Sequence, residues 1–201
     1  MKLNNRSIPR KCLDRELNKL YLKGMTLDIG SKRPQYSHIC KELIALDYYH
    51  FEGVDVIADA HNLPFKENSF DNIIMTNLLE HVQEPQKVVN EAYRVLKPNG
   101  LVIVFTPFMY PIHGDPNDYW RFTDEGLKYL LKNFDIVKVI KIGGFFGVIG
   151  TYFYFILNNL KLKFLLPILN IFIFLDDKFP WIFKKTACGF LVVAKKATDK
   201  Y

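Results

Sequence analysis

The sequence predicts an α/β protein with an open, mostly parallel sheet and helices on both faces. Short apolar runs that suit buried strands alternate with helical patterns through about the first 135 residues. Some of these runs are almost continuously apolar, as in strands that are covered on both faces. Of the 201 residues, 49% are hydrophobic, which is enough for one substantial core. We therefore expect a single domain over residues 1–201, with right-handed crossovers between its parallel strands.

The first half of the chain supplies most of the predicted strands. Apolar residues at helical spacing predict an amphipathic helix over residues 10–22, namely Leu13, Leu17, Leu20 and Tyr21. A second helix is expected over residues 33–43. Short apolar segments predict strands over residues 25–30, 44–49, 54–59 and 70–77.

The second half continues the alternation. Pro85 opens a helix, and "KPNG" at 97–100 ends it. Thr123 can cap a further helix, whose first turn carries acidic residues that complement the helix dipole. Strands are expected over residues 101–107, 136–143 and 189–196.

Two strongly apolar segments, residues 145–157 and 164–175, form an insert at about 146–184. Neither reaches the roughly 18–20 residues that span a bilayer. The insert could lie on a membrane surface, form a homodimer interface, close as a lid over a hydrophobic acceptor, or pack on the core of its own domain. On a membrane, nearby lysines would meet anionic headgroups, namely Lys161, Lys163, Lys178, Lys184 and Lys185.

Charge is distributed unevenly along the chain, which carries a formal net charge of +6. Residues 1–137 have a net charge of −1 (17 Lys/Arg, 18 Asp/Glu), and residues 138–201 have +7 (10 Lys/Arg, 3 Asp/Glu). The last third therefore either faces an anionic partner or is a solvated lysine-rich surface. Because this charge lies away from the predicted site, we expect no nucleic-acid partner.

The cysteines and the N-terminus indicate a cytoplasmic location. Three scattered cysteines are too few for a disulfide framework or a zinc site, which favours a reducing compartment. The first 24 residues contain no apolar signal core. We expect a cytoplasmic protein, with membrane association through the insert as an open alternative.

Polar residues stand at the carboxyl ends of the predicted strands, where ligands bind in open α/β sheets. Gly30 allows a tight turn that would bring backbone N–H groups toward a ligand. Asp47 follows 17 residues later, near the spacing at which an acid accepts hydrogen bonds from ribose hydroxyls. Asp59 can accept from an exocyclic amine, and Asn77 ends the fourth strand. Each acid alone could equally be a helix cap or a turn former, but their order suits a nucleoside.

The segment "LDIG…LDYY…VIADAHNLPFKENSFDNIIMTNLLEHVQEPQKVVNEAYRVLKPNGLVIVFTPF" resembles the class I S-adenosylmethionine-dependent methyltransferases. It is most similar to the type 11 group, and the specific pattern spans Asp59 to Gly100. The resemblance implies a Rossmann-like, seven-stranded sheet whose last strand is antiparallel. In that fold the apolar insert falls between the sixth and seventh strands.

The resemblance also implies cofactor contacts at matching positions. Asp28 and Gly30 would line the methionine part of S-adenosylmethionine, and Asp47 would hold the ribose. The remaining contacts would be Asp59 and Ala60 at the adenine, and Asn77 and Leu78 beside the transferred methyl group. Glu80 and His81 belong to the family signature at a helix start, where they are either structural or, for His81, in contact with substrate.

The chain departs from the family in the first loop. Lys32 and Pro34 stand where the family usually has glycines, and only Gly30 remains. Lys32 or Arg33 could bind the cofactor carboxylate directly through a charge-assisted hydrogen bond. The substitution could equally mark a site that binds the cofactor poorly.

The segment over residues 107–127 is the predicted acceptor side, because loops at this end of the sheet often carry function. His113 is the candidate general base, with Asp115 or Asp118 orienting it. Arg121 could hold an anionic substrate group, and three aromatic residues could stack on a sugar or face the sulfonium, namely Tyr110, Tyr119 and Trp120. Alternatively the segment is structural, with Arg121 paired to Asp118. A metal held by these acids and His113 is not expected, because the spacing matches no known cage.

The segment resembles a subgroup of these methyltransferases with an H-x-x-P-x-D-Y-x-R-F-T run, found in sugar and cell-surface polysaccharide contexts. The expected function is therefore methyl transfer from S-adenosylmethionine to a small-molecule, sugar, or lipid-linked or surface-glycan acceptor, through O-methylation. The alternative is a non-catalytic binding or scaffold protein on the same fold, anchored by its apolar insert.

Overall fold

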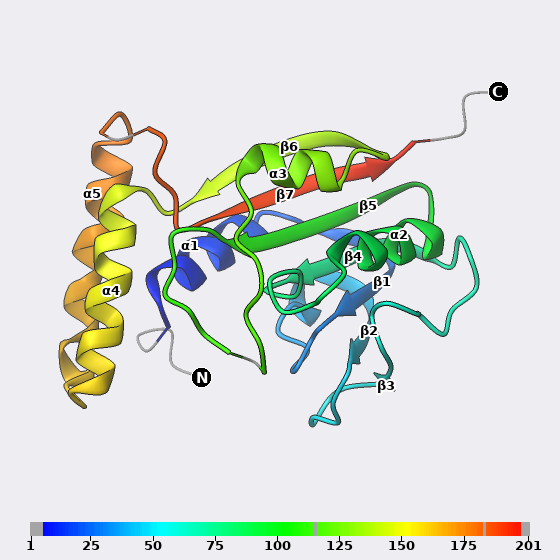
Figure 1. Ribbon diagram of the computed structural model, residues 1–201, viewed down its shortest axis with the longest axis horizontal. Helices are drawn as coiled ribbons and strands as arrows, with labels where there is room; N and C mark the ends of the chain where they lie inside the picture. The colour runs from blue at the N-terminus through cyan, green and yellow to red at the C-terminus, as the bar shows by residue number, and fades with distance from the viewer. Residues whose placement is uncertain (1–5, 115, 183, 198–201) are drawn as a thin grey trace.

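Seven strands form one mixed sheet in the order β3-β2-β1-β4-β5-β7-β6 (Figure 1). The computed structural model describes residues 6–114, 116–182 and 184–197. The strands are β1 (Leu22–Ile29), β2 (Cys40–Asp47), β3 (Val56–Ile57), β4 (Phe70–Thr76), β5 (Leu96–Pro107), β6 (Phe134–Ile142) and β7 (Gly189–Lys196). Neighbours from β3 to β5 pair in parallel, and β7 runs antiparallel to both β5 and β6. The predicted seven-stranded sheet with an antiparallel last strand is confirmed.

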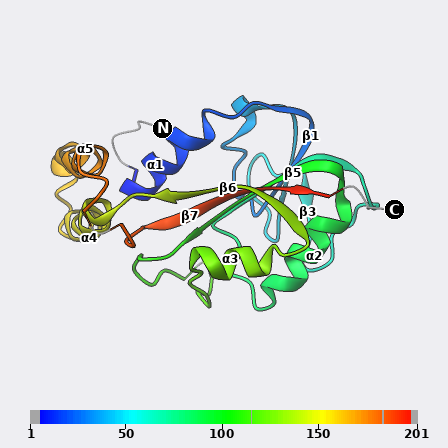
Figure 2. The same ribbon diagram turned by 90° about the horizontal axis from the view of Figure 1, so that it is seen from above.

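Helices cover both faces of the sheet, as Figure 2 shows. They are α1 (Ile8–Leu17), α2 (Pro85–Val95), α3 (Asp124–Leu130), α4 (Phe145–Asn159) and α5 (Asn170–Lys178), with 3-10 turns η2 (Ser37–Ile39) and η3 (Lys163–Leu169). The α2 and α3 helices pack on one face, and α1 packs on the other. Thr123 caps α3 as predicted, because its hydroxyl accepts a hydrogen bond from Gly126 N at 3.0 Å.

Packing on both faces of the central strand β5 explains why its sequence is almost continuously apolar from residue 101 onward. Val102 and Val104 join the core beneath α2 and α3. Ile103 and Phe105, which alternate with them, join the core beneath α1. Since successive side chains point to opposite faces of a sheet, a strand covered on both sides must be apolar at every position.

The prediction of a helix over residues 33–43 is wrong. The structure has only the η2 turn there, and β2 already begins at Cys40. Lys32 adopts a positive φ of 45°, and Arg33 precedes a proline, which disfavours helical conformation. The α1 helix covers this face instead, and Tyr36 and Ile39 are buried in the same core as α1.

Other elements differ from the prediction mainly at their ends. The first helix lies at Ile8–Leu17, earlier than the predicted 10–22. The third strand is reduced to Val56–Ile57 and pairs with Leu46 and Asp47 of β2. The α2 helix ends at Val95, but the "KPNG" segment that follows it lies within β5, where the register shifts between Leu96 and Leu101. In this segment Asn99 adopts a φ of 65°, a conformation that asparagine tolerates well.

The two apolar segments form α4, η3 and α5, between β6 and β7. The α4 helix has no capping side chain of its own at Gly144. Instead the Asp176 carboxylate of α5 accepts hydrogen bonds from the backbone N–H groups of Gly144, Phe146 and Gly147, at 2.7, 3.0 and 2.8 Å. This acid fixes α5 against the start of α4. Within the described residues, no helix combines the length and hydropathy needed to cross a membrane.

Candidate functional site

A cavity of about 800 Å³ lies at the carboxyl ends of β1, β2 and β4. All eight predicted cofactor residues line it, namely Asp28, Gly30, Lys32, Asp47, Asp59, Ala60, Asn77 and Leu78. The parallel strands place them together because their carboxyl ends share one edge of the sheet. This volume lies within the range of pockets that hold small organic ligands, roughly 300–1,000 Å³.

Asp28 is the most deeply buried acid of the cavity, with 2% of its surface exposed. Its Oδ2 accepts a hydrogen bond from the Ser31 hydroxyl at 2.8 Å. Burial raises the pKa of Asp28 to about 7, despite the opposing hydrogen bond from Ser31 and the charge of Arg10. This carboxyl is therefore suited to meet a positively charged ligand group, which would favour its ionised form.

The first loop does not offer its N–H groups to the cavity in the way the sequence suggested. Gly30 N and Ser31 N both donate to Leu46 O, at 2.8 and 3.0 Å, and Lys32 N donates to Asp47 Oδ2 at 2.9 Å. No helix follows this loop, so its N–H groups are not gathered at a helix N-terminus. The expectation that Gly30 directs backbone donors toward a ligand is therefore wrong. Gly30 is needed for its φ of 74°, and an added Cβ would approach Leu78 to 3.0 Å.

Asp47 and Asp59 differ in how their carboxylates are held. Asp47 is buried, and its second oxygen accepts from Tyr49 N at 3.0 Å. Asp59 is more exposed, and one of its oxygens contacts both the backbone N–H and the ring of His61, at 2.9 and 2.7 Å. Both acids keep lone pairs for a ligand, since a carboxylate offers about four acceptor positions.

The end of β4 reaches the cavity through a residue in the left-handed backbone conformation. Asn77 follows Thr76 with a φ of 52°, and its N–H donates to Phe105 O at 3.0 Å. Non-glycine residues in this conformation often occur at functional sites, where the surrounding structure holds them in place. The conformation turns the chain so that Asn77 and Leu78 both line the cavity.

Basic side chains from two separate segments also reach the cavity. Lys32 and Arg33 line it from the first loop, and Arg6 and Arg10 line it from α1 and the residues before it. Lys32 Nζ lies 5.5 Å from the centre of the Phe51 ring. The two arginines were missed by the sequence prediction, because only tertiary packing brings α1 beside the first loop.

His113 lines the same cavity, with its ring centre 5.0 Å from that of Tyr110. Its backbone N–H donates to Asp118 Oδ2 at 2.9 Å, and its Nδ1 lies 3.3 Å from Pro111 O and 3.4 Å from Asp118 Oδ2. Burial, followed by the charge of His81, lowers the pKa of His113 below its ordinary 6.5. A neutral imidazole at physiological pH can accept a proton.

Asp118 and Arg121 do not themselves line the cavity within the described residues. They form a bidentate ion pair, in which Nη2 of Arg121 donates to Oδ2 of Asp118 at 2.6 Å. The Arg121 guanidinium holds the pKa of Asp118 down at about 2. The structural alternative from the sequence described this pairing of Arg121 with Asp118. The pair also braces the backbone of His113, which donates to Asp118. Asp115, the other predicted orienting acid, lies outside the described residues.

The loops after β4 and β5 are joined by hydrogen bonds that the sequence did not reveal. Glu80 O accepts from Tyr119 N at 2.8 Å, and His81 Nδ1 bonds Asn117 O. Trp120 Nε1 donates to a neighbouring carbonyl, Val82 O, at 2.9 Å. Trp120 is therefore held by the protein, whereas Tyr119 and Tyr110 line the cavity. These contacts fix the acceptor loop to the family-signature turn.

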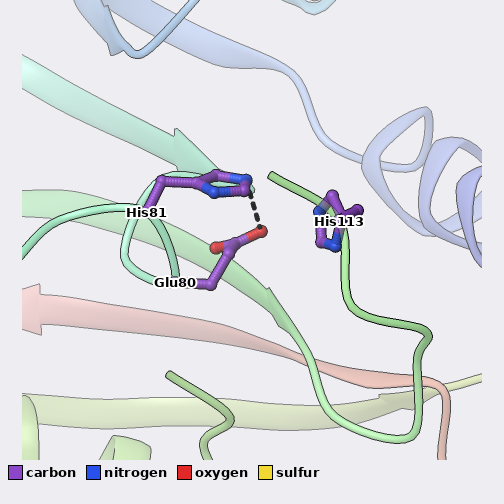
Figure 3. Close-up of side chains that lie close together, drawn as sticks. All are labelled: Glu80, His81 and His113. Atoms are coloured by element: carbon purple, nitrogen blue, oxygen red, sulfur yellow. Dashed lines mark ion pairs between the residues drawn. The ribbon is translucent and has the colours of Figure 1, made fainter. Parts of the chain in front are cut away.

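Glu80, His81 and His113 lie close together in Figure 3. Each offers a ligand atom, and these atoms lie within 4.8 Å of one another, so this group of the described residues could hold a metal ion. Glu80 is fully buried, neither of its carboxylate oxygens has a hydrogen-bond partner, and burial raises its pKa to about 8. Its Oε1 lies 3.7 Å from His81 Nε2. The sequence prediction missed this group, because His113 is brought to the other two only by the folded loops.

The chain matches the type 11 methyltransferase family, described as "Methyltransferase domain", over residues 30–104. It is 36% identical over 105 residues to a ubiquinone/menaquinone biosynthesis C-methyltransferase UbiE of Brucella canis, a match that covers 51% of this chain and 35% of the relative. The chain spans only 24% to 40% of the length of such curated relatives.

Solved structures show the same fold. A S-adenosylmethionine-dependent methyltransferase of Thermotoga maritima superposes with a TM-score of 0.61, at 19% identity, and covers 96% of this chain and 92% of its own. A 1,6-didemethyltoxoflavin-N1-methyltransferase of Burkholderia thailandensis, solved with bound S-adenosylhomocysteine, gives 0.59 at 14% identity, with 98% and 79% covered.

The family match runs from the end of β1 into β5, so it contains most of the strand ends that build the cavity. The sheet order and the position of the acids at these ends agree with it. The match over residues 30–104, the sheet order and the acids at the strand ends support a class I S-adenosylmethionine-dependent methyltransferase of the type 11 group.

Proposed function

We propose that this chain binds S-adenosylmethionine in the 800 Å³ cavity and methylates a small-molecule acceptor held beside His113. The observation that carries the proposal is the placement of Asp28, Asp47 and Asp59 at three strand ends around one cavity that also contains His113. Asp28 would meet the amino group of the cofactor, Asp47 the ribose hydroxyls and Asp59 the adenine amine. Ala60, Asn77 and Leu78 would contact the apolar parts of the cofactor.

The cofactor supplies a methyl group on a sulfonium, and its transfer is an in-line displacement by the acceptor. The protein has to align the acceptor and exclude water. For a hydroxyl acceptor, His113 would take the hydroxyl proton as the oxygen–methyl bond forms and the sulfur–methyl bond breaks. The Asp118–Arg121 pair would hold the His113 loop, and we assign both residues a positioning role. Asp115 stays a second candidate for orienting His113.

The nature of the acceptor is the least constrained part of the proposal. We favour O-methylation of a sugar, a lipid-linked acceptor or a surface glycan, because Tyr110 and Tyr119 line the cavity near His113 and can stack on a ring. Curated relatives are named as C-methyltransferases of ubiquinone and menaquinone biosynthesis. An activated carbon acceptor is therefore the second candidate, since the same base can remove its proton.

A non-catalytic binding protein remains the alternative from another functional class. Calorimetric titration with S-adenosylhomocysteine is the first step, and it tests whether the chain binds the cofactor at all. A cofactor-release assay over candidate sugars, glycolipids and quinols is the second step, and a chain that binds the cofactor but methylates none of these classes would contradict the enzymatic proposal.

Replacing Asp47 with alanine should reduce S-adenosylhomocysteine affinity by roughly a hundredfold or more, because each charge-assisted hydrogen bond contributes about 1.5–3 kcal/mol. The variant also removes the acceptor of two backbone N–H groups, those of Lys32 and Tyr49, which donate to Asp47 in the native chain. Asp47→Asn keeps one acceptor oxygen and should lose less affinity. Isothermal titration calorimetry measures both variants.

Asp55→Ala is the matched control for Asp47→Ala. Asp55 also accepts a backbone hydrogen bond, from Ala45 N at 2.8 Å, but it does not line the cavity. It should leave the affinity within about threefold of the native value. Equal losses in Asp47→Ala and Asp55→Ala would show that the effect comes from the β2 backbone rather than from a ligand contact.

Lys32 and Arg33 are proposed to hold the cofactor carboxylate in place of the missing glycines. The double variant Lys32→Ala/Arg33→Ala should bind S-adenosylhomocysteine about tenfold or more weakly, while binding of 5′-methylthioadenosine, which lacks the amino-acid part, should change little. Lys41→Ala is the control, because Lys41 is an exposed lysine at the far end of β2. A parallel loss for both ligands would contradict a carboxylate contact.

A further inference from the structure

The α4, η3 and α5 segments expose an unusual number of large apolar side chains. Figures 1 and 2 show α4 and α5 side by side at one end of the molecule, beyond the end of β6. The exposed apolar residues of this surface, here called the apolar hairpin, are Tyr152, Phe153, Ile156, Leu160, Phe164, Ile168, Ile171, Phe174 and Trp181. Phe164 is the most exposed of them, at 75%. Contiguous apolar surface of this kind is rare on a protein that has no partner there.

The exposed residues follow helical spacing on each segment. On α4 and directly after it they recur at 152, 156 and 160, and on η3 and α5 they recur at 164, 168, 171 and 174. The buried residues of α4 lie in its first half, at Gly147, Val148, Gly150 and Thr151, so its exposed apolar residues belong to its second half. Phe153 stacks on Phe172 of α5, with ring centres 5.8 Å apart, so aromatic side chains join the two helices.

Lysines surround the apolar hairpin, and its acids are already in use. The lysines are Lys161, Lys163, Lys178, Lys184 and Lys185, and none of them forms an ion pair with a carboxylate of the described chain. Asp176 accepts backbone hydrogen bonds at the start of α4. Asp177 forms a bidentate pair with Arg15, at 2.7 and 3.1 Å. The outward charge of this surface is therefore strongly positive.

The apolar hairpin is also connected to the acceptor side of the cavity. Tyr154 of α4 lines the cavity itself. Phe155 contacts Tyr110, with ring centres 5.5 Å apart, and Tyr110 contacts the His113 ring at 5.0 Å. Any surface on which the apolar hairpin rests would therefore lie close to the acceptor side of the cavity, near Tyr110 and His113.

We propose that the apolar hairpin docks this chain on the surface of an anionic phospholipid bilayer, with its aromatic and aliphatic side chains in the interface and its lysines at the headgroups. Interfacial segments combine a buried apolar face with basic residues in this way. A second copy of the chain fits the surface less well, because a two-fold interface would bring the same lysines against each other. The proposal does not depend on methyl transfer, but it would place the cavity within reach of a membrane-borne acceptor.

Flotation of the full chain with vesicles tests this directly. The chain should float with phosphatidylcholine vesicles that contain phosphatidylglycerol, much less with phosphatidylcholine alone, and less at high salt. Lys161→Glu/Lys163→Glu should weaken binding at least about tenfold, since each lysine near an anionic surface contributes about fivefold. Phe164→Ser/Ile168→Ser should also weaken it at least about tenfold through lost apolar burial.

Tyr129→Ser is the matched control, because Tyr129 is 70% exposed on α3, on the opposite side of the sheet from α1. It should float like the native chain. A native chain that stays at the bottom with anionic vesicles at low salt would overturn the proposal, as would light scattering showing a dimer that Phe164→Ser/Ile168→Ser dissociates. Titration of each variant with S-adenosylhomocysteine distinguishes failure of membrane docking from failure of the proposed function, since docking can fail while the cofactor still binds.

Discussion

Asp28→Asn should make the chain more stable and at the same time impair cofactor binding. Asp28 is buried, and its pKa is raised to about 7 by burial. Replacing it with the neutral, isosteric amide should raise the free energy of unfolding by on the order of 4 kcal/mol at pH 8, since the pKa is raised by about three units and one unit corresponds to about 1.4 kcal/mol. Ser31 can still donate to the amide oxygen. Denaturant unfolding at several pH values measures this gain.

The sign of the pH dependence follows from the direction of the shift. Because the folded chain holds the Asp28 proton more tightly than the unfolded chain, raising the pH from the ordinary 3.8 to about 7 lowers stability progressively. The cost is fully present above pH 7 and shrinks toward acid pH. The advantage of Asp28→Asn should therefore be largest at pH 8 and much smaller at pH 5.

Cofactor binding should change in the opposite direction. The positively charged amino group of S-adenosylhomocysteine would favour ionised Asp28, so we expect roughly ten- to hundredfold weaker binding by the variant. Near pH 7, binding by the native chain should release a proton, detectable as a dependence of the calorimetric heat on the buffer, and the variant should show none. Asp71→Asn is the control, because the hydrogen bond from Lys97 lowers the pKa of Asp71, so this variant should lose stability.

A native-like affinity in Asp28→Asn, with no proton release by the native chain, would contradict the assignment of Asp28 to the amino group. A loss of stability at pH 8 would contradict the raised pKa itself. These two results are independent, because the first concerns the ligand and the second concerns the free protein.

The sequence predicts the sheet well because its strands are marked by local chemistry. Residues 101–105 of β5 and 190–194 of β7 are apolar throughout, and the predicted 189–196 strand is the one observed. The absence of a helix at 33–43 could not be predicted from local chemistry in the same way. Its place is taken by α1, which reaches the same face from the other end of β1, and no local pattern in either segment reports that packing.

The same division holds in the site. The positions of Asp28, Asp47 and Asp59 were predictable, because the strand order brings together the carboxyl ends of the strands that carry or precede them. The Glu80–His81–His113 group was not, since it depends on how two loops bond to each other. Arg10 likewise reaches the cavity only through the packing of α1.

His113→Gln should lower the rate of methyl transfer by roughly 10²–10⁴-fold, the usual contribution of a general base, while leaving S-adenosylhomocysteine affinity unchanged. The reason is that His113 lines the cavity but is not among the residues assigned to the cofactor. His38→Gln is the control, because His38 is exposed and bonds Asn18 in a turn outside the cavity. The rate is measured as product formation with an acceptor found in the release assay.

The pH profile and a chelator decide between a base and a metal ligand at His113. As a base with a lowered pKa, His113 should keep the native rate high below pH 6.5, and the rate should fall only as the imidazole becomes protonated. Removal of divalent ions should then change nothing. If a chelator abolishes turnover and added metal restores it, Glu80, His81 and His113 act together as ligands, and the proton must be removed by another group. The two outcomes exclude each other, because a ring nitrogen bound to a metal has no lone pair left for a proton.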